Sequence, residues 1–243
     1  MTSNHFPTFQ RWFSLALGWL TEPASPRRQR QFYWFLSLGA LAGAVYHLTR
    51  PGEPMFPFDD SYITLHNAQV LLSGHDANYE GVSALYGATS LPHLVLVALA
   101  LLVLPPPHAL LLTQWLAVWV YAVGLLLLAF VHRTSSVFAV ALTITGLGVG
   151  LSVHQLFNGL ETGLALSGMV WTLVLASPSV PRRPLLLAVL LGTLPFFRPE
   201  FFAFSVPVSG LIVYRMWRAE QCLAPVLRFL TCVALGALPW LVA

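Results

Sequence analysis

The sequence consists largely of long apolar segments separated by short polar links, and most of these links contain arginine. Hydrophobic residues make up 57% of the 243 residues, and charged residues make up only 9%. A soluble domain of this length does not need so much apolar side chain for its core. The pattern therefore predicts an integral membrane protein of the all-α class, built as a polytopic bundle of transmembrane helices.

About seven segments are expected to cross the bilayer. The first, Phe32 to Thr49, has 18 residues, and a helix of that length reaches about 27 Å, close to the ~30 Å hydrocarbon thickness. The other six are residues 109–131, 136–156, 162–177, 185–197, 201–217 and 226–243. Residues 1–31 then form a cytoplasmic or interfacial N-terminus, and residues 32–243 form one transmembrane domain.

The apolar segment 91–104 decides the topology, because its 14 residues reach only about 21 Å as a helix. If the segment is re-entrant and does not cross, ten of the twelve positive charges, all arginines, lie on the cytoplasmic side with the N-terminus. If it crosses, six of those arginines lie outside, against the positive-inside rule. We favour the re-entrant arrangement. The basic excess is then a topology signal, and no nucleic-acid partner is needed to explain it.

Residues 50–90 form the one long polar interval and hold five of the nine carboxylates. In the favoured topology this interval is an external loop. Asp60 or Ser61 is expected to cap a juxtamembrane helix that ends at Ser73, with Gly74 as its stop. One aspartate is enough for a cap, so the adjacent pair in "FDDSY" needs a further explanation.

The favoured topology also brings distant ionisable residues to the same outer face. Asp59 and Asp60 are joined there by Glu161 of "NGLET" and by Arg198 and Glu200 of "FRPE". An ionisable residue near membrane depth costs ~2.5–3.5 kcal/mol on insertion scales, so its presence beside apolar runs points to function. The sequence therefore predicts one shared external site.

Each of these residues also has a structural interpretation, which stays open. The aspartates are consistent with helix capping, and Glu161 with stabilisation of a helix N-terminus. Arg198 and Glu200 are consistent with an ion pair around the intervening proline. His66 and His75 lack metal-ligand spacing, so they are expected to be polar wall residues and not ligands.

Three stretches carry a resemblance to a known family. "FDDSYITLHNAQVLLSGHDANYEG" (58–81), followed by "YGATSLPHLVL" (86–96), resembles the first external loop of the GT-C superfamily of membrane glycosyltransferases. "GLET" (159–162) and "RPEF" (198–201) are similar to motifs that follow, in the same order, in its bacterial arabinofuranosyltransferase-like and mannosyltransferase-like branch. The resemblance covers roughly residues 30 to 240.

The resemblance implies an enzyme that transfers a sugar from a polyprenyl-phosphate donor to an acceptor hydroxyl of a cell-envelope glycan or lipid. It places the site on the periplasmic face of the bacterial inner (plasma) membrane. Asp59 matches the leading aspartate of the motif and is expected to act as the base in a single inverting displacement. Asp60 would orient the acceptor, and two adjacent carboxylates raise the pKa of one of them.

The remaining roles are assigned by residue type and side of the membrane. Arg198 suits the leaving lipid phosphate, because a guanidinium pairs with phosphate through two hydrogen bonds. Asp59, Asp60 and Glu161 are candidate ligands of a divalent cation such as Mg²⁺ or Mn²⁺. The substrate-binding candidates are Arg198, Glu200, Glu161, Tyr62, His66 and His75.

The sequence departs from the family pattern in two places. The acidic residue expected before Tyr-Thr-Ser-Pro-Leu is absent from "LYGATSLP", and the chain ends at "GALPWLVA", where family members continue into further spans. We therefore expect a truncated C-terminus and a separate chain that supplies the missing spans. The alternative class is a non-catalytic membrane scaffold, a remnant or half-subunit of such an enzyme. A transporter is a weaker third option, because the acids gather at one face.

Overall fold

The computed structural model describes residues 14, 17–76, 79, 81, 83, 85, 88, 90–177 and 183–241. Over these residues the regular structure is helical, apart from one isolated β-bridge between Pro23 and Ser135. The prediction of an all-α fold is confirmed. Of the predicted N-terminus, residues 1–31, the structure describes residue 14 and residues 17–31, and Glu80 of the polar loop also lies outside the described residues.

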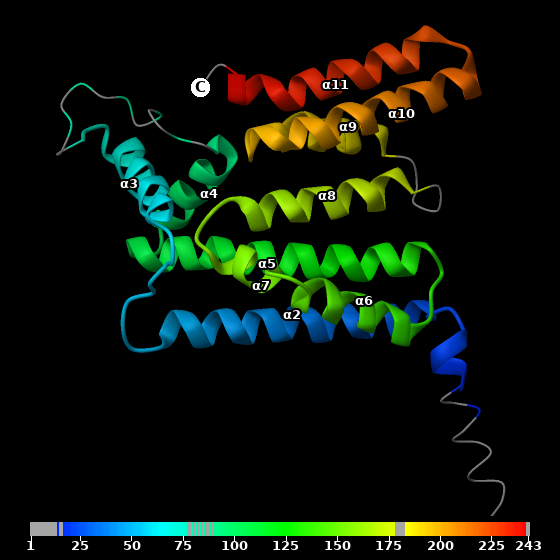
Figure 1. Ribbon diagram of the computed structural model, residues 1–243, viewed down its shortest axis with the longest axis horizontal. Helices are drawn as coiled ribbons and strands as arrows, with labels where there is room; N and C mark the ends of the chain where they lie inside the picture. The colour runs from blue at the N-terminus through cyan, green and yellow to red at the C-terminus, as the bar shows by residue number, and fades with distance from the viewer. Residues whose placement is uncertain are drawn as a thin grey trace, which may run out of the picture.

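Most of the helices lie side by side in an extended array (Figure 1). α5 packs against α2, α6 and α8, and α9 packs against α8 and α11. The members of the array are α2 (Pro26–Thr49), α5 (Pro106–Val131), α8 (Thr162–Ala176), α9 (Pro184–Thr193), α10 (Phe202–Glu220) and α11 (Leu223–Leu241). Segments far apart in the sequence therefore meet at each end of the array.

Two helices, α3 (Asp59–Ser73) and α4 (Leu91–Leu101), lie together at one end of the array (Figure 1). α2 ends and α5 begins at this same end, so the chain between them returns to the end that it left. The 11 residues of α4 reach only about 16 Å, roughly half the hydrocarbon thickness of a bilayer. The chain between α2 and α5 therefore does not run the length of the array.

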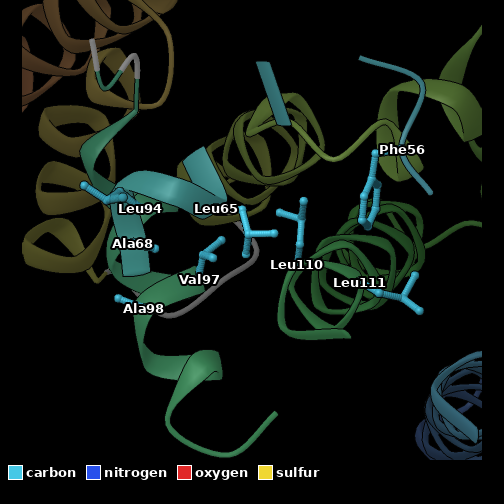
Figure 2. Close-up of a cluster of buried hydrophobic side chains, with 8 residues drawn as sticks. All are labelled: Phe56, Leu65, Ala68, Leu94, Val97, Ala98, Leu110 and Leu111. Carbon is cyan, nitrogen blue, oxygen red and sulfur yellow. The ribbon is translucent and has the colours of Figure 1, made fainter. Parts of the chain in front are cut away.

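A buried apolar cluster joins α3 and α4 to the array. Leu65 of α3 lies beside Val97 of α4, with Leu110 of α5 next to it (Figure 2). Truncation of a fully buried leucine such as Leu110 typically costs about 2–5 kcal/mol. The cluster contains Phe56, Leu65, Ala68, Leu94, Val97, Ala98, Leu110 and Leu111. It fixes the position of α3, and therefore of the aspartates in its first turn.

Two apolar segments are less regular than the sequence predicts. The continuous segment expected at 136–156 is interrupted, because α6 (Ser136–Gly148) and α7 (Ser152–Phe157) are separated by a turn in which Gly150 has φ +61°. After α9 the chain forms two short 3₁₀ turns, Leu194–Phe196 and Pro199–Phe201. Proline in each turn removes a helical donor, which stops the α-helix before Arg198.

Two of the described helices, α5 and α11, are long and apolar enough to cross a membrane. α4, α6, α8 and α9 are apolar but shorter. α2 and α10 have 24 and 19 residues and carry arginines near one end. Large apolar side chains are exposed along the outer helices, among them Trp34, Phe35, Leu38 and Leu41 of α2 and Leu227, Leu230, Leu235 and Leu238 of α11.

Candidate functional site

The site is built where the start of α3 meets the turn between α7 and α8. Ser61 is fully buried, and its hydroxyl donates a hydrogen bond of 2.8 Å to the Asn158 carbonyl, 97 residues further along the chain. Gly159 has φ +82°, and a Cβ at this position would lie only 2.5 Å from Ser61 Oγ. A glycine is required here both for the backbone conformation and for the close approach of α3.

The turn itself is held by buried amides. The Asn158 side chain accepts a 2.9 Å hydrogen bond from the Leu160 N–H and donates a 3.0 Å bond to Gln155 Oε1. Gln114 of α5 donates to the Leu160 carbonyl at 3.4 Å. Buried amides that are hydrogen-bonded on several sides define one conformation of a loop. The turn therefore presents the next residue, Glu161, in a fixed position.

Glu161 forms an ion pair with Arg198 in which only the carboxylate is buried. Arg198 Nε lies 3.1 Å from Glu161 Oε1, and Arg198 Nη1 donates to Thr162 Oγ1 at 3.4 Å. Glu161 is only 2% exposed, whereas the Arg198 side chain is 38% exposed. Glu200 Oε2 lies 4.0 Å from Arg198 Nε, and its side chain is 71% exposed. The arginine therefore links a buried carboxylate to the molecular surface.

Burial and neighbouring charges both shift the pKa of the Glu161 carboxyl. Burial is the largest cause and raises the pKa of Glu161 above its ordinary value. A backbone hydrogen bond and the Arg198 guanidinium lower this pKa, whereas the negative charges of Glu200 and Asp60 raise it. The net shift of the pKa is upward. Asp60 therefore lies close enough to act on Glu161 electrostatically. Glu161 Oε2 has no hydrogen-bond partner among the described residues. Three separate segments thus converge on one carboxyl.

Asp59 and Asp60 occupy the first turn of α3 and are exposed. The prediction that Asp60 or Ser61 caps this helix is wrong, because Phe58 occupies the N-cap position without a side-chain hydrogen bond. The Ser61 hydroxyl bonds to Asn158 instead. Acidic residues in a first turn still interact favourably with the helix dipole. The predicted helix end is confirmed, since Gly74 closes α3 with φ +70°.

The three aromatic and imidazole candidates take different positions. Tyr62 and His66 follow Asp59 at i+3 and i+7, so they share its face of α3. The Tyr62 hydroxyl accepts a 3.1 Å hydrogen bond from the Phe56 N–H, and His66 Nε2 lies 3.1 Å from Asp76 Oδ2. His75 follows the end of α3, about 20 Å from the first turn along the helix. The structure does not bring His75 to the carboxylates.

Several polar residues that hold the site were missed by the sequence reasoning. Gln114 is a polar residue inside an apolar run, which is a recognisable signal. Asn158 directly precedes the "GLET" stretch and could have been considered with it. Asp76 is one of the five carboxylates of the polar interval, and its contact with His66 is not predicted by the sequence. Ser61 was assigned to the wrong hydrogen bond, since nothing local indicates a partner 97 residues away.

A divalent cation was also expected at Asp59, Asp60 and Glu161. In the described part of the chain, no group of three or more His, Cys, Asp or Glu side chains is arranged to hold a metal ion. One Glu161 oxygen is already paired with Arg198, and a cation there would compete with the guanidinium. The cation stays a prediction, and no chemical step is assigned to it.

Comparison with known proteins adds no relative. No protein-family model, no curated protein and no solved structure matches the chain. What can be said of its function therefore rests on the motifs in its sequence and on the convergence of Asp60, Glu161 and Arg198 at one end of the helix array.

Proposed function

We propose that the chain is a membrane glycosyltransferase of the GT-C type. It transfers a sugar from a polyprenyl-phosphate donor to an acceptor hydroxyl at the outer face of the bacterial inner membrane. The observation that carries this proposal is the ion pair between buried Glu161 and partly exposed Arg198, with Asp60 near enough to act on the Glu161 carboxyl. Asp60, Glu161 and Arg198 come from the three stretches whose order resembles that family. Glu161 and Arg198 follow Asp60 by about 100 and 140 residues.

The proposed membrane arrangement has seven crossings and a cytoplasmic N-terminus. The ends of the array differ in charge, which supports this orientation. Helix ends opposite α3 carry most of the described arginines: Arg27, Arg28, Arg30, Arg133, Arg183, Arg215, Arg218 and Arg228. Basic residues collect on the cytoplasmic side of bilayers. The carboxylate end then faces outward, and the exposed apolar side chains of α2 and α11 face lipid.

In the proposed reaction, Asp59 takes the proton of the acceptor hydroxyl as the hydroxyl oxygen attacks the anomeric carbon. The new bond forms as the bond from the anomeric carbon to the lipid-phosphate oxygen breaks, and the configuration inverts. The electron pair of the broken bond leaves with the phosphate. Arg198 stabilises that charge with N–H groups that Glu161 and Thr162 do not use. Glu161 positions the guanidinium.

The other candidates have supporting roles in this proposal. Glu200 lies 4.0 Å from the arginine, and Asp60 acts electrostatically on Glu161. Both carboxylates would bind hydroxyl groups of the sugar or the acceptor. Tyr62 and His66 share the Asp59 face of α3 and would line the acceptor path. His75 is too far along the helix to join them and is not assigned a role.

The test is glycosyl transfer from a panel of radiolabelled polyprenyl-phosphate sugars in membranes that contain the chain. Wild type is compared with Asp59→Asn and with Glu53→Gln, which removes an exposed carboxylate from the same loop. We expect transfer that Asp59→Asn lowers about 10²–10⁴-fold and that Glu53→Gln preserves. The assay is repeated with any chain encoded immediately downstream. No transfer in either setting from a folded, inserted protein would favour the non-catalytic scaffold.

A further inference from the structure

A cavity of about 350 Å³ lies at the end of the array opposite the carboxylates. It is enclosed by the end of α8, the start of α9, the end of α10 and the start of α11, and its rim carries Arg183, Arg215 and Arg228. The distance from Glu161 is considerable, since the 15 residues of α8 separate the two regions by about 21 Å. This cavity takes no part in the proposed transfer reaction.

The three arginines of this cavity are not balanced by an acidic side chain among the residues whose side chains the structure describes. None of them forms an ion pair with another described residue, whereas Arg198 at the other end is paired with Glu161. A guanidinium stays ionised at every physiological pH, so like charges around one hollow cannot relieve their repulsion by losing a proton. An anion bound between them would do so. Phosphate suits this arrangement, because guanidinium groups bind it through paired hydrogen bonds.

The ends of four helices meet at the cavity, two of them N-terminal and two C-terminal. Pro184 in the first turn of α9 and Pro225 in the first turn of α11 both line the cavity. The first turn of a helix carries backbone N–H groups without intrahelical partners and the positive end of the helix dipole. The last turns of α8 and α10 line the same cavity with the negative ends of their dipoles, so the positive character of the site comes from the three arginines.

The inner walls of the cavity are apolar. Leu187, Met216 and Phe229 line it, and Phe229 is almost completely buried. Leu185 also lines it and is half exposed on the outer surface of α9. A freely soluble phosphate compound would gain nothing from these walls. A phospholipid would place its headgroup at the arginines and its acyl chains against the apolar surface.

We propose that this cavity binds the phosphate headgroup of an anionic phospholipid of the cytoplasmic leaflet. The proposal rests on the membrane location proposed for the chain and not on glycosyl transfer. The lipid would neutralise Arg183, Arg215 and Arg228 together and would join the α8–α9 hairpin to the α10–α11 hairpin. The site is thus a structural lipid site at the opposite side of the membrane from the carboxylates.

The experiment measures lipid binding to the purified chain in detergent by native mass spectrometry, with phosphatidylglycerol, phosphatidylcholine and inorganic pyrophosphate as separate probes. Wild type is compared with Arg215→Gln/Arg228→Gln. The charge-matched control is Arg27→Gln/Arg218→Gln, which removes two exposed arginines of the same end that do not line the cavity. A melting curve without lipid checks that each variant is folded.

We expect phosphatidylglycerol to bind wild type and the control alike, and the cavity variant roughly 25-fold more weakly, at about fivefold per arginine. If the double variant does not fold, Arg215→Gln alone is expected to lose about fivefold. Equal binding by the cavity and control variants would overturn the proposal. So would equal binding of phosphatidylcholine, or pyrophosphate binding that displaces phosphatidylglycerol, which would indicate a site for soluble phosphate.

Discussion

The two ends of the helix array differ in whether their arginines are paired with acidic side chains. At the α3 end, Arg198 is paired with buried Glu161, and Asp60 lies near enough to influence that carboxyl. At the opposite end, Arg183, Arg215 and Arg228 surround a cavity without an ion-pair partner among the described residues. Charges that the protein itself balances are held in a fixed geometry, which suits chemistry. Charges that it leaves unbalanced suit a ligand supplied from outside.

The largest expected effect is on the rate of glycosyl transfer, which should depend on the carboxylate end and not on the arginine end. Because Asp59 is proposed as the general base, Asp59→Asn is expected to lower the transfer rate about 10²–10⁴-fold. Arg218→Gln, at the arginine end and outside the cavity, is expected to leave the rate unchanged within about twofold. Initial rates at saturating donor measure this difference. A similar loss in both variants would mean that activity reports overall folding and not the carboxylate end.

The contact beneath α3 is expected to be sensitive to a single methyl group. Gly159→Ala places a Cβ against Ser61 at a positive φ, so we expect a loss of about 2–4 kcal/mol in the free energy of unfolding. Gly148→Ala is the matched control, since a Cβ there has nothing within 4 Å, and it should be neutral or stabilising. Denaturant unfolding in detergent distinguishes them. Equal stability of the two variants would show that α3 does not approach the turn so closely.

Substitution of one arginine at each end tests whether the two ends contribute differently to stability. Arg198→Gln leaves Glu161 buried without its partner, which is expected to cost about 1–3 kcal/mol of stability. Arg215→Gln removes an exposed charge without a partner and is expected to change stability by less than about 0.5 kcal/mol in lipid-free detergent. Thermal unfolding measures both. The comparison fails if Arg215→Gln is as destabilising as Arg198→Gln.

The smallest expected effect is the pH dependence of the Glu161 contribution. Burial, the largest cause, raises the pKa of Glu161 above its ordinary value. The folded protein then binds this proton more tightly than the unfolded chain does. Stability from this group is therefore fully present below its ordinary pKa and is lost as the pH rises through its raised pKa.

Melting midpoints measured from about pH 4 to pH 7 test this sign, because Glu161→Gln removes the titrating group while Glu53→Gln removes an exposed loop carboxyl. The midpoint of wild type relative to Glu161→Gln should fall with increasing pH. A rise with pH would mean that Arg198 outweighs burial and that the pKa is lowered. The difference in melting midpoint between wild type and Glu53→Gln is the baseline for this comparison.

Much of the helical structure could be predicted from the sequence, because helix formation depends on local composition. The end of α3 at Ser73 and Gly74 is an example, since glycine adopts the left-handed conformation that closes a helix. The arginine pattern also predicted that Asp60, Glu161 and Arg198 belong to the same end. The interruption at Val149 to Leu151 was not predicted, because the apolar composition continues through it.

The sequence by itself determined the all-helical class, most of the helix positions and the grouping of Asp60, Glu161 and Arg198 at one end. All three depend on hydropathy and charge along the chain. Only the tertiary structure decided that Ser61 bonds to Asn158 and does not cap α3, that Glu161 pairs with Arg198, and that three other arginines enclose a cavity. These features depend on distances between segments that are far apart in the sequence, and such distances are set by helix packing.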